Sequence, residues 1–436
     1  MDFDPKLTRR EMVKWGLLST GVPILSTTLG AAALGQDLGP GDRFVGDIGG
    51  RDAEKLYTGH PVVGGGQMEI RLNQSIYTDD PHELEVAQRL EPFNPQSWYQ
   101  EWHRVAEINE ELAEGYAEQG LNISANQFYL RAFRFHRASI VYQEDTDATM
   151  MPGYLKMREM FDKAWEMDPP PIERITVNVD GNQLDGYFTK PGGPDGTRYP
   201  TVIAYLGADS MAESTVLGSG SYTSRGMAVL VVDLPGQGAA KRIQRLYMPP
   251  DTERLVSDLI DYLETRPDVD ADRIGVRGIS MGGYSAPRAA SADSRIKAVW
   301  TSAGSHDLLR DLFEYYPPIQ DRVRWIIGAE DLADARQKLA DYTLEDVAQK
   351  IECPMLIGYG RTDRIMDPEG AFRLYQAAVN SDRQMWSGAG HPHHDEKSGG
   401  PQDLRLPTAQ DWAARKLGAI ADEVDEQGRP AGSSVG

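Results

Sequence analysis

Three side chains that together could perform nucleophilic catalysis occur in the order Ser280, Asp363 and His391. In such a set the histidine takes the proton from the serine hydroxyl, while the aspartate orients the imidazole and stabilises its charged form. The activated serine oxygen attacks a carbonyl carbon and forms a covalent acyl intermediate. This chain order is typical of hydrolases built on an open, mostly parallel sheet. These three residues are therefore the predicted catalytic residues.

The segment that carries Ser280 is predicted to fold as a strand, a sharp turn and a helix. Residues 274–284 read Ile-Gly-Val-Arg-Gly-Ile-Ser-Met-Gly-Gly-Tyr, and small residues follow as far as Ala290. Such a turn strains the serine backbone, so only glycine fits closely on either side. The backbone N–H of Met281 then points at the reacting carbonyl. The Gly-x-Ser-x-Gly pattern alone is weak in a chain with 44 glycines, so the flanking strand and helix carry the prediction.

Asp363 and His391 also follow predicted strands. Residues 353–360 form an apolar run that ends in glycines just before Asp363, and a short strand at 383–386 leads towards His391. Groups that follow the carboxyl ends of parallel strands converge in one crevice of an open sheet. We therefore expect the three predicted catalytic residues to lie at the same edge of the sheet.

Neighbouring residues offer alternatives for two of these roles. Asp367 could be the acid, but it precedes Pro368 and has the position of a helix N-cap. His393 and His394 could be the base, and residues 391–395 could instead bind a metal ion. No further ligand motif at a supporting spacing accompanies that cluster, so we expect neither a metal nor an organic cofactor.

Alternating strands and helices predict the fold. Apolar runs at 200–206, 227–232 and 296–301 read as buried strands, and the pattern at 252–264 is that of an amphipathic helix. This alternation predicts a doubly wound α/β fold with a mostly parallel sheet over 169–420. The loop after the strand at 200–206 should supply the second oxyanion donor, and the N–H of Ala208 is the candidate.

Residues 81–168 are predicted to form a helical domain that ends at three consecutive prolines. Trp98 and Trp102 fall on one face of a helix, where packing against other helices is their ordinary role. A functional interpretation is that the domain caps the crevice and that these rings contact an apolar or aromatic substrate. Asp307 and Asp311, which follow the strand at 296–301, could polarise a hydroxyl or ketone of a substrate, although surface charge or helix capping is the ordinary role of each.

Four segments of the chain carry a family resemblance. It rests on the elbow around Ser280, on Trp-Tyr-Gln-Glu-Trp-His-Arg-Val-Ala at 98–106, on Tyr-Leu-Arg-Ala at 129–132, and on Gly-Ala-Asp-Ser at 207–210. These segments resemble the fermentation-respiration switch protein and 2,6-dihydroxypseudooxynicotine hydrolase-like family of α/β-hydrolases. The resemblance implies an N-terminal helical cap over the active site, and it places Ser280, Asp363 and His391 on the family's triad positions. It also implies cleavage of an ester or of a carbon–carbon bond in a 1,3-diketone.

Other functions are compatible with the same motifs. A prolyl oligopeptidase-like peptidase shares the elbow and the order of the triad, but such enzymes usually carry a β-propeller where this chain is predicted to be helical. A non-catalytic binding protein on a hydrolase scaffold would not label with a serine probe. A third interpretation is an interaction protein whose helical domain binds a stoichiometric partner.

The N-terminus predicts export. Residues 8–14 read Thr-Arg-Arg-Glu-Met-Val-Lys, and an apolar run ending in small residues follows, so residues 1–35 fit a twin-arginine signal peptide. We accordingly expect a periplasmic or secreted enzyme that meets the export machinery in transit. Residues 36–80 are expected to be irregular, and the polar tail at 421–436 is expected to be disordered.

Composition limits the partners. The net charge is −21, and loss of residues 1–35 removes four basic and three acidic residues, which leaves −22. Nucleic acid and anionic membrane surfaces are poor partners for such a chain, so a small-molecule substrate is the expected partner and a homodimer stays open. The single cysteine, Cys353, allows no intramolecular disulfide and lies in a predicted buried strand.

Overall fold

A computed structural model of the chain describes residues 80–91, 94–143, 146–361, 363–388, 391 and 408–420. The predicted signal peptide at 1–35, the segment at 36–79 and the tail at 421–436 lie outside the described residues. So do His393 and His394, the alternative candidates for the catalytic base.

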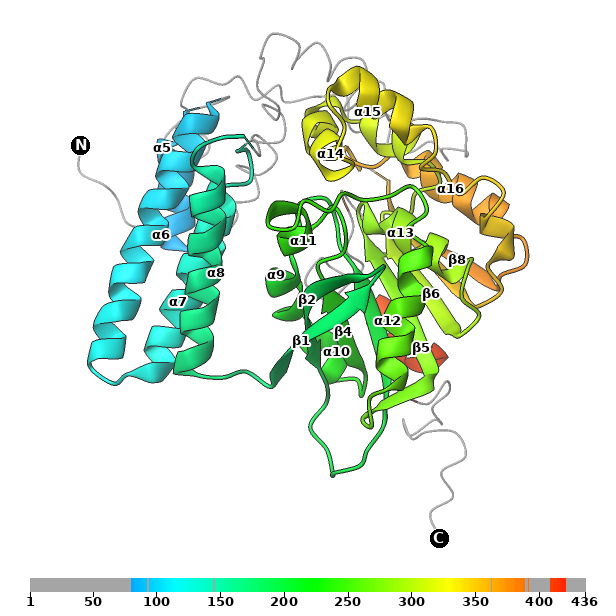
Figure 1. Ribbon diagram of the computed structural model, residues 1–436, viewed down its shortest axis with the longest axis horizontal. Coiled ribbons are helices and arrows are strands. Elements are labelled where there is room, and N and C mark those ends of the chain that lie inside the picture. The colour runs from blue at the N-terminus through cyan, green and yellow to red at the C-terminus, as the bar shows by residue number, and fades with distance from the viewer. Residues whose placement is uncertain are drawn as a thin grey trace, which may run out of the picture. The chain divides into compact units, whose positions relative to one another are not determined.

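The core of the fold is an eight-stranded sheet in the order β1-β2-β4-β3-β5-β6-β7-β8 (Figure 1). The strands are β1 (Ile172–Val179), β2 (Asn182–Thr189), β3 (Tyr199–Tyr205), β4 (Ala228–Val232), β5 (Val269–Ile279), β6 (Ile296–Ser302), β7 (Met355–Gly360) and β8 (Arg383–Gly388). Strands β4, β3, β5, β6, β7 and β8 pair in parallel. Strands β1 and β2 join them as an antiparallel edge. The predicted doubly wound, mostly parallel α/β fold is therefore confirmed.

The hairpin of β1 and β2 was not among the elements predicted from the sequence. Its turn consists of Asp180 and Gly181, which both have positive φ, at 51° and 75°. An Asp-Gly pair with both residues in the left-handed region is typical of a tight hairpin turn. The local signal for this hairpin was thus present in the sequence, between two runs of alternating apolar residues.

Helices cover both faces of the sheet, and every residue of β3 and β4 is therefore buried. One core packs around α12 (Arg254–Glu264), α13 (Gly282–Ala290) and α16 (Pro368–Ala377). The other packs around α9 (Ala212–Val216), α10 (Gly220–Thr223) and α17 (Ala409–Lys416). The helix predicted at 252–264 is confirmed as α12, which buries Leu255, Leu259 and Leu263.

Four helices precede the sheet: α5 (Pro81–Arg89), α6 (Pro95–Glu118), α7 (Asn122–Ser139) and α8 (Met150–Met167). Helices α5 and α6 each begin with proline after an N-cap, Asp80 and Asn94, whose side chains accept hydrogen bonds from the first turn. Residues of α7 and α8 also pack into the second core of the sheet, so these helices continue the hydrophobic interior of the α/β unit.

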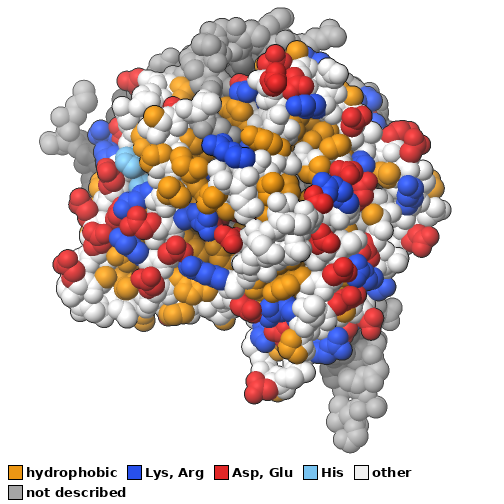
Figure 2. Space-filling model, viewed as in Figure 1, with side chains coloured by type: hydrophobic (Ala, Val, Ile, Leu, Met, Phe, Trp, Pro, Cys, Tyr) orange, Lys and Arg blue, Asp and Glu red, His pale blue; other side chains and the backbone are white. Residues whose placement is uncertain are grey.

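Short helices lie on the remaining connections. They are α11 (Gly238–Arg242) after β4, followed by η1 (Leu309–Phe313), η2 (Pro317–Ile319), α14 (Gln320–Ile326), α15 (Leu332–Leu339) and η3 (Ala348–Lys350) between β6 and β7. No helix in the described part of the chain has both the length and the apolarity to cross a membrane. On the face shown in Figure 2, acidic and basic side chains are interspersed.

Candidate active site

The turn at Ser280 has the backbone strain expected of a nucleophile elbow. Strand β5 ends at Ile279, α13 begins at Gly282, and Ser280 between them has φ of 55°. A non-glycine residue in this region costs about 1–3 kcal/mol and persists only where its surroundings enforce it. The Ser280 N–H donates to the Ser302 carbonyl at 2.8 Å, which ties the turn to the end of β6.

The glycines beside Ser280 are required by close backbone contacts. A Cβ added to Gly278 would lie 1.8 Å from the Gly282 carbonyl oxygen. A Cβ on Gly282 would lie 2.7 Å from the Tyr205 carbonyl oxygen, and one on Gly283 would lie 2.2 Å from that of Ala303. Side chains at these positions would therefore push the helix away from the strand and move the serine.

Asp363 and His391 meet directly. Asp363 Oδ2 lies 2.7 Å from His391 Nδ1, and the aspartate is buried while the imidazole is partly exposed. Asp363 Oδ1 accepts from the N–H groups of Ile365 at 2.8 Å and Met366 at 3.0 Å. The Tyr315 hydroxyl donates to the Asp363 carbonyl at 2.8 Å. These hydrogen bonds fix the Asp363 carboxylate, and its Oδ2 atom orients the imidazole.

The three predicted catalytic residues follow the carboxyl ends of β5, β7 and β8. These strands lie in the consecutive order β5-β6-β7-β8 and run parallel, so the residues occupy one edge of the sheet. Asp367, the alternative acid, is buried and accepts from the N–H of Glu369 at 3.0 Å as the N-cap of α16. The structure therefore gives Asp367 the capping position that was its ordinary interpretation.

The loop after β3 passes beside Ser280. A Cβ added to Gly207 would lie 3.2 Å from the Ser280 Cβ, and Ala208 is the next residue. Among the described residues, neither the Ala208 N–H nor the Met281 N–H donates a hydrogen bond to any acceptor. Buried or half-buried backbone donors are normally satisfied, so two free donors near the serine suit a transient oxyanion.

Residues from distant elements, which were not predicted from the sequence, hold this loop in place. Gln237 Nε2 donates to the Leu206 carbonyl at 3.0 Å. Arg137 of α7 donates to the Asp209 carbonyl at 2.8 Å, and Arg322 Nε of α14 lies 3.4 Å from Asp209 Oδ1. No local signal marks these partners because each of these contacts spans more than 30 residues of sequence.

Two buried carboxylic acids lie behind the same loop. Asp233 accepts from the Ala212 N–H at 2.9 Å and from the Ala239 N–H at 2.8 Å. Glu213 is 2% exposed, and its Oε1 lies 3.4 Å from Arg158 Nε of α8. Burial, together with the nearby charge of Asp233, raises the pKa of Glu213 to about 7. These contacts fix the start of α9, which directly follows the loop.

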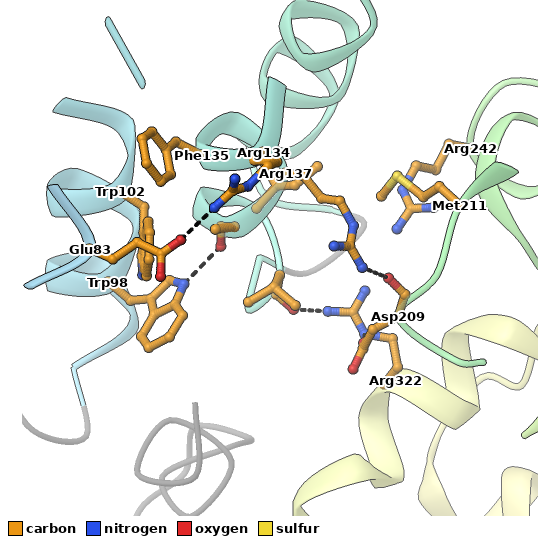
Figure 3. A pocket seen from close by; sticks show the side chains of 13 residues that line it. Glu83, Trp98, Trp102, Arg134, Phe135, Arg137, Asp209, Met211, Arg242 and Arg322 are labelled. Carbon is orange, nitrogen blue, oxygen red and sulfur yellow. Dashed lines mark hydrogen bonds and ion pairs between the residues drawn. The ribbon is translucent and has the colours of Figure 1, made fainter. Parts of the chain in front are cut away.

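A cavity of about 270 Å³ lies beside the loop (Figure 3). Trp98 and Trp102 of α6 line it together with Phe135 of α7. Asp209 and several guanidinium groups complete the wall. The two indole rings therefore serve helix packing and also face a cavity, and Trp98 Nε1 donates to the Ala138 carbonyl at 2.8 Å.

The two aspartates proposed as substrate contacts have different positions. Asp311 is fully buried: its Oδ2 accepts from the Ser305 hydroxyl at 2.9 Å and from the backbone N–H groups of His306 and Asp307 at 2.8 and 2.9 Å. Its Oδ1 pairs with Arg373. Because both oxygens are occupied by protein groups, the prediction of a substrate contact for Asp311 is corrected: it braces the loop after β6. Asp307 is half-buried and accepts from the Arg310 N–H at 3.0 Å, so its role stays a prediction.

Within the described ranges, no three His, Cys, Asp or Glu side chains group closely enough to hold a metal ion. Most of the 391–395 cluster lies outside those ranges.

The comparisons with known proteins all find esterases or hydrolases. The family described as "Esterase FrsA-like" matches residues 82–366. "Hydrolase LUC6" of Fusarium sp is 28% identical over 352 residues, which cover 70% of this chain and 84% of that protein. "2,6-dihydropseudooxynicotine hydrolase" of Paenarthrobacter nicotinovorans is 28% identical over 272 residues, which cover 62% of this chain and 72% of that one. The crystal structure of the 2,6-dihydroxy-pseudo-oxynicotine hydrolase superposes with a TM-score of 0.65 at 23% identity, covering 79% of this chain and 95% of that chain.

Proposed function

Since this chain belongs to the FrsA-like esterase family and is a hydrolase of the α/β fold, we propose that it is a serine hydrolase acting through an acyl-enzyme. In this proposal Ser280 is the nucleophile, His391 the base and Asp363 the orienting acid. The observation that carries it is the strained Ser280 backbone at the sheet edge where Asp363 holds His391 at 2.7 Å. The bond cleaved is a carboxylic ester or the carbon–carbon bond of a 1,3-diketone.

The proposed reaction has two halves. His391 Nε2 takes the hydroxyl proton as Ser280 Oγ attacks the carbonyl carbon, and the N–H groups of Met281 and Ala208 stabilise the oxyanion. Collapse of the intermediate breaks the bond to the leaving group, which receives the proton from His391. An ester releases an alcohol, and a diketone releases an enolate carbon that is protonated to a ketone. Water activated by His391 then hydrolyses the acyl-enzyme to a carboxylic acid and restores Ser280.

One part of the cavity beside the oxyanion loop, formed by Trp98, Trp102 and Phe135, supports an apolar or aromatic group on the substrate. Its aromatic wall and its modest volume suit a ring or a short apolar chain, which aromatic side chains bind by stacking and edge contacts. Asp209 lines this cavity and directly follows the proposed donor Ala208. Helices α6 and α7 would then act as a cap that positions the substrate, and their proposed substrate contacts are Trp98 and Trp102. The relatives named for hydrolysis of 2,6-dihydropseudooxynicotine and 20-hydroxy-prefusarin support a small-molecule substrate.

No observation favours the peptidase or binding-protein alternatives. Within residues 80–168 the described chain is helical, so the region that precedes the sheet there contains no β-propeller. A pure binding protein would have no use for an aspartate that orients a histidine at the edge of the sheet that carries the serine.

The test is a hydrolysis screen that pairs aryl and alkyl esters with aryl 1,3-diketones, together with labelling by a fluorophosphonate probe. Ser280→Ala should abolish turnover and labelling. Ser294→Ala, the same change at an exposed serine, should alter neither. Diketone cleavage to an acid and a ketone would assign carbon–carbon hydrolysis, and ester turnover alone would assign an esterase. Serine-independent turnover, or none, would overturn the proposal.

We propose further that residues 1–35 direct export by the twin-arginine route to the periplasm or the exterior. Replacing Arg9 and Arg10 by lysine should then retain the full-length chain in the cytoplasm. Cell fractionation measures this directly, and an unchanged distribution would count against the proposal.

A further inference from the structure

Arg277 is a charged residue within the central strand of the sheet, three positions before Ser280. It is half-buried, and its Nε atom is buried without a hydrogen-bond partner. Over the described ranges, its guanidinium has no ion pair or hydrogen bond, and it lies over the Tyr222 ring, 5.4 Å from the centroid. A guanidinium removed from water without an anion is costly, and central strands of parallel sheets are usually apolar.

The Arg277 side chain lines a cavity of about 370 Å³ at the carboxyl ends of β5 and β6. Hydroxyl groups supply much of the polar lining, from Ser210, Ser214, Thr215, Ser221 and Ser302. Arg277 is the one charged side chain among the described residues that line it. The positive charge of Arg277 would therefore favour an anion in this cavity, although the Ser214 and Ser221 hydroxyls already donate to the carbonyls of Met211 and Gly218.

A second polar group in the wall also lacks a partner. Gln410, in the first turn of α17, is 6% exposed and lines the same cavity. Its Oε1 is buried and accepts no hydrogen bond from the described part of the chain. Buried polar groups are normally satisfied, so the unpaired guanidinium of Arg277 facing this cavity indicates a missing anion. Gln410 Oε1 can only accept, so it would contact a carboxylate only after the amide turns to present its NH2 group.

We infer that this cavity binds a small carboxylate, with Arg277 as its ion-pair partner. One guanidinium matches the single charge of a carboxylate, with which it can form two parallel hydrogen bonds. An ionised phosphate carries more charge than this lining neutralises. The carboxylate is either a remote end of the substrate or a separate carboxylic acid. The binding itself does not depend on the proposed hydrolysis.

The cavity is adjacent to the proposed nucleophile. Gly278 and Ile279 line it, and so does Ser302, whose carbonyl accepts from the Ser280 N–H at 2.8 Å. Ser210, which also lines it, lies two residues after the proposed oxyanion donor Ala208. An occupant would thus contact the elbow and, through Ser210, the oxyanion loop. Asp209 of the same loop lines the other cavity, which Trp98 also lines.

Calorimetric titration of the whole protein with benzoate tests the binding, and benzamide is the neutral probe of the same shape. Benzoate should bind both the wild type and Ser280→Ala. Arg277→Gln should weaken it by about tenfold or more, because a charge-assisted bidentate pair is lost. Arg336→Gln, which removes a charge from an exposed ion pair, should leave binding unchanged. Benzamide should not bind at this site.

The inference is overturned if benzoate does not bind the wild type, binds Arg277→Gln equally well, or is matched by benzamide. Tighter Arg277-dependent binding of inorganic phosphate would overturn the carboxylate assignment. If Arg277→Gln does not fold, as judged by circular dichroism, Arg277→Lys replaces it. That variant keeps the charge but loses the planar fork, so a drop of several-fold is expected, and unchanged affinity counts against the inference.

Two esters distinguish the sources of the carboxylate. The half-ester p-nitrophenyl hydrogen glutarate carries a terminal carboxylate, and p-nitrophenyl valerate is its neutral counterpart. If the substrate supplies the carboxylate, Arg277→Gln should raise KM for the glutarate alone. If a separate acid occupies the site, KM for both esters should change equally or not at all while benzoate binding is lost. Should neither ester be hydrolysed, the proposed function fails while the titration of Ser280→Ala still reports on binding.

Discussion

Replacement of Asp363 by asparagine tests the proposed acid with almost no change in shape. In the wild type, Asp363 Oδ1 accepts from the N–H groups of Ile365 and Met366 at 2.8 and 3.0 Å. Both partners are donors, so the asparagine must place its oxygen in this position. Its NH2 group is then forced into the position of Oδ2, which faces His391 Nδ1 at 2.7 Å.

This exchange reverses the hydrogen bond to the imidazole. With the carboxylate present, the proton lies on Nδ1 and Nε2 is free to act as a base. The asparagine NH2 group can only donate, so it selects the tautomer with the proton on Nε2. The same substitution in a serine protease lowers kcat by about 10⁴-fold through this tautomer. A loss of that size corresponds to about 5.4 kcal/mol in activation free energy, and we expect a similar loss here.

The assay is kcat on whichever ester or diketone is turned over fastest, with thermal unfolding measured in parallel. Asp367→Asn is the matched control, because Asp367 is also buried but caps α16 through the Glu369 N–H at 3.0 Å. Asparagine caps helices about as well as aspartate, so this variant should keep its kcat. A folded Asp363→Asn variant that retains more than about a tenth of the wild-type kcat would refute the assignment of Asp363 as the orienting acid.

Three other predictions concern the elbow, the buried acid and the cavity. Gly278→Ala should destabilise the fold by about 3 kcal/mol or more in chemical denaturation, because its Cβ would lie 1.8 Å from a backbone oxygen. Gly115→Ala, in α6 with no atom within 4 Å, should stabilise it by up to about 1 kcal/mol. Burial and Asp233 raise the pKa of Glu213 to about 7, so the folded state binds the extra proton between about pH 4.5 and 7. The wild-type melting temperature should therefore fall as pH rises through this window, and Glu213→Gln should flatten the slope. Trp102→Ala should raise KM for aryl esters about fivefold more than for alkyl esters in steady-state kinetics.

Each of these predictions has an opposing result. Equal effects of alanine on stability at Gly278 and Gly115 would mean that the close contact in the elbow does not contribute to the stability of the fold. A melting temperature that rises with pH between 5 and 7 would contradict the protonation assigned to Glu213. Equal increases in KM for aryl and alkyl esters would show that Trp102 does not contact the aryl group of the substrate.

Local sequence determined the elements that position the proposed site. Apolar runs specified the central strands, and the spacing of Leu255, Leu259 and Leu263 specified α12. The glycines around Ser280 encode a turn that tolerates no Cβ, and Asp367 before Pro368 encodes a helix cap. These features depend on backbone conformation and on burial of one face, which a few consecutive residues decide. For that reason they were predictable without knowledge of the partners.

Only the tertiary structure decided which charged groups have ion-pair or hydrogen-bond partners. Asp311 follows a strand as a substrate contact would, yet Arg373, Ser305 and two backbone N–H groups occupy its carboxylate. Arg277 lies in the strand predicted before Ser280, and only the fold places its guanidinium at a cavity without an anion. The free energy of a charge depends on neighbours brought from distant parts of the chain, and a linear pattern does not contain those distances.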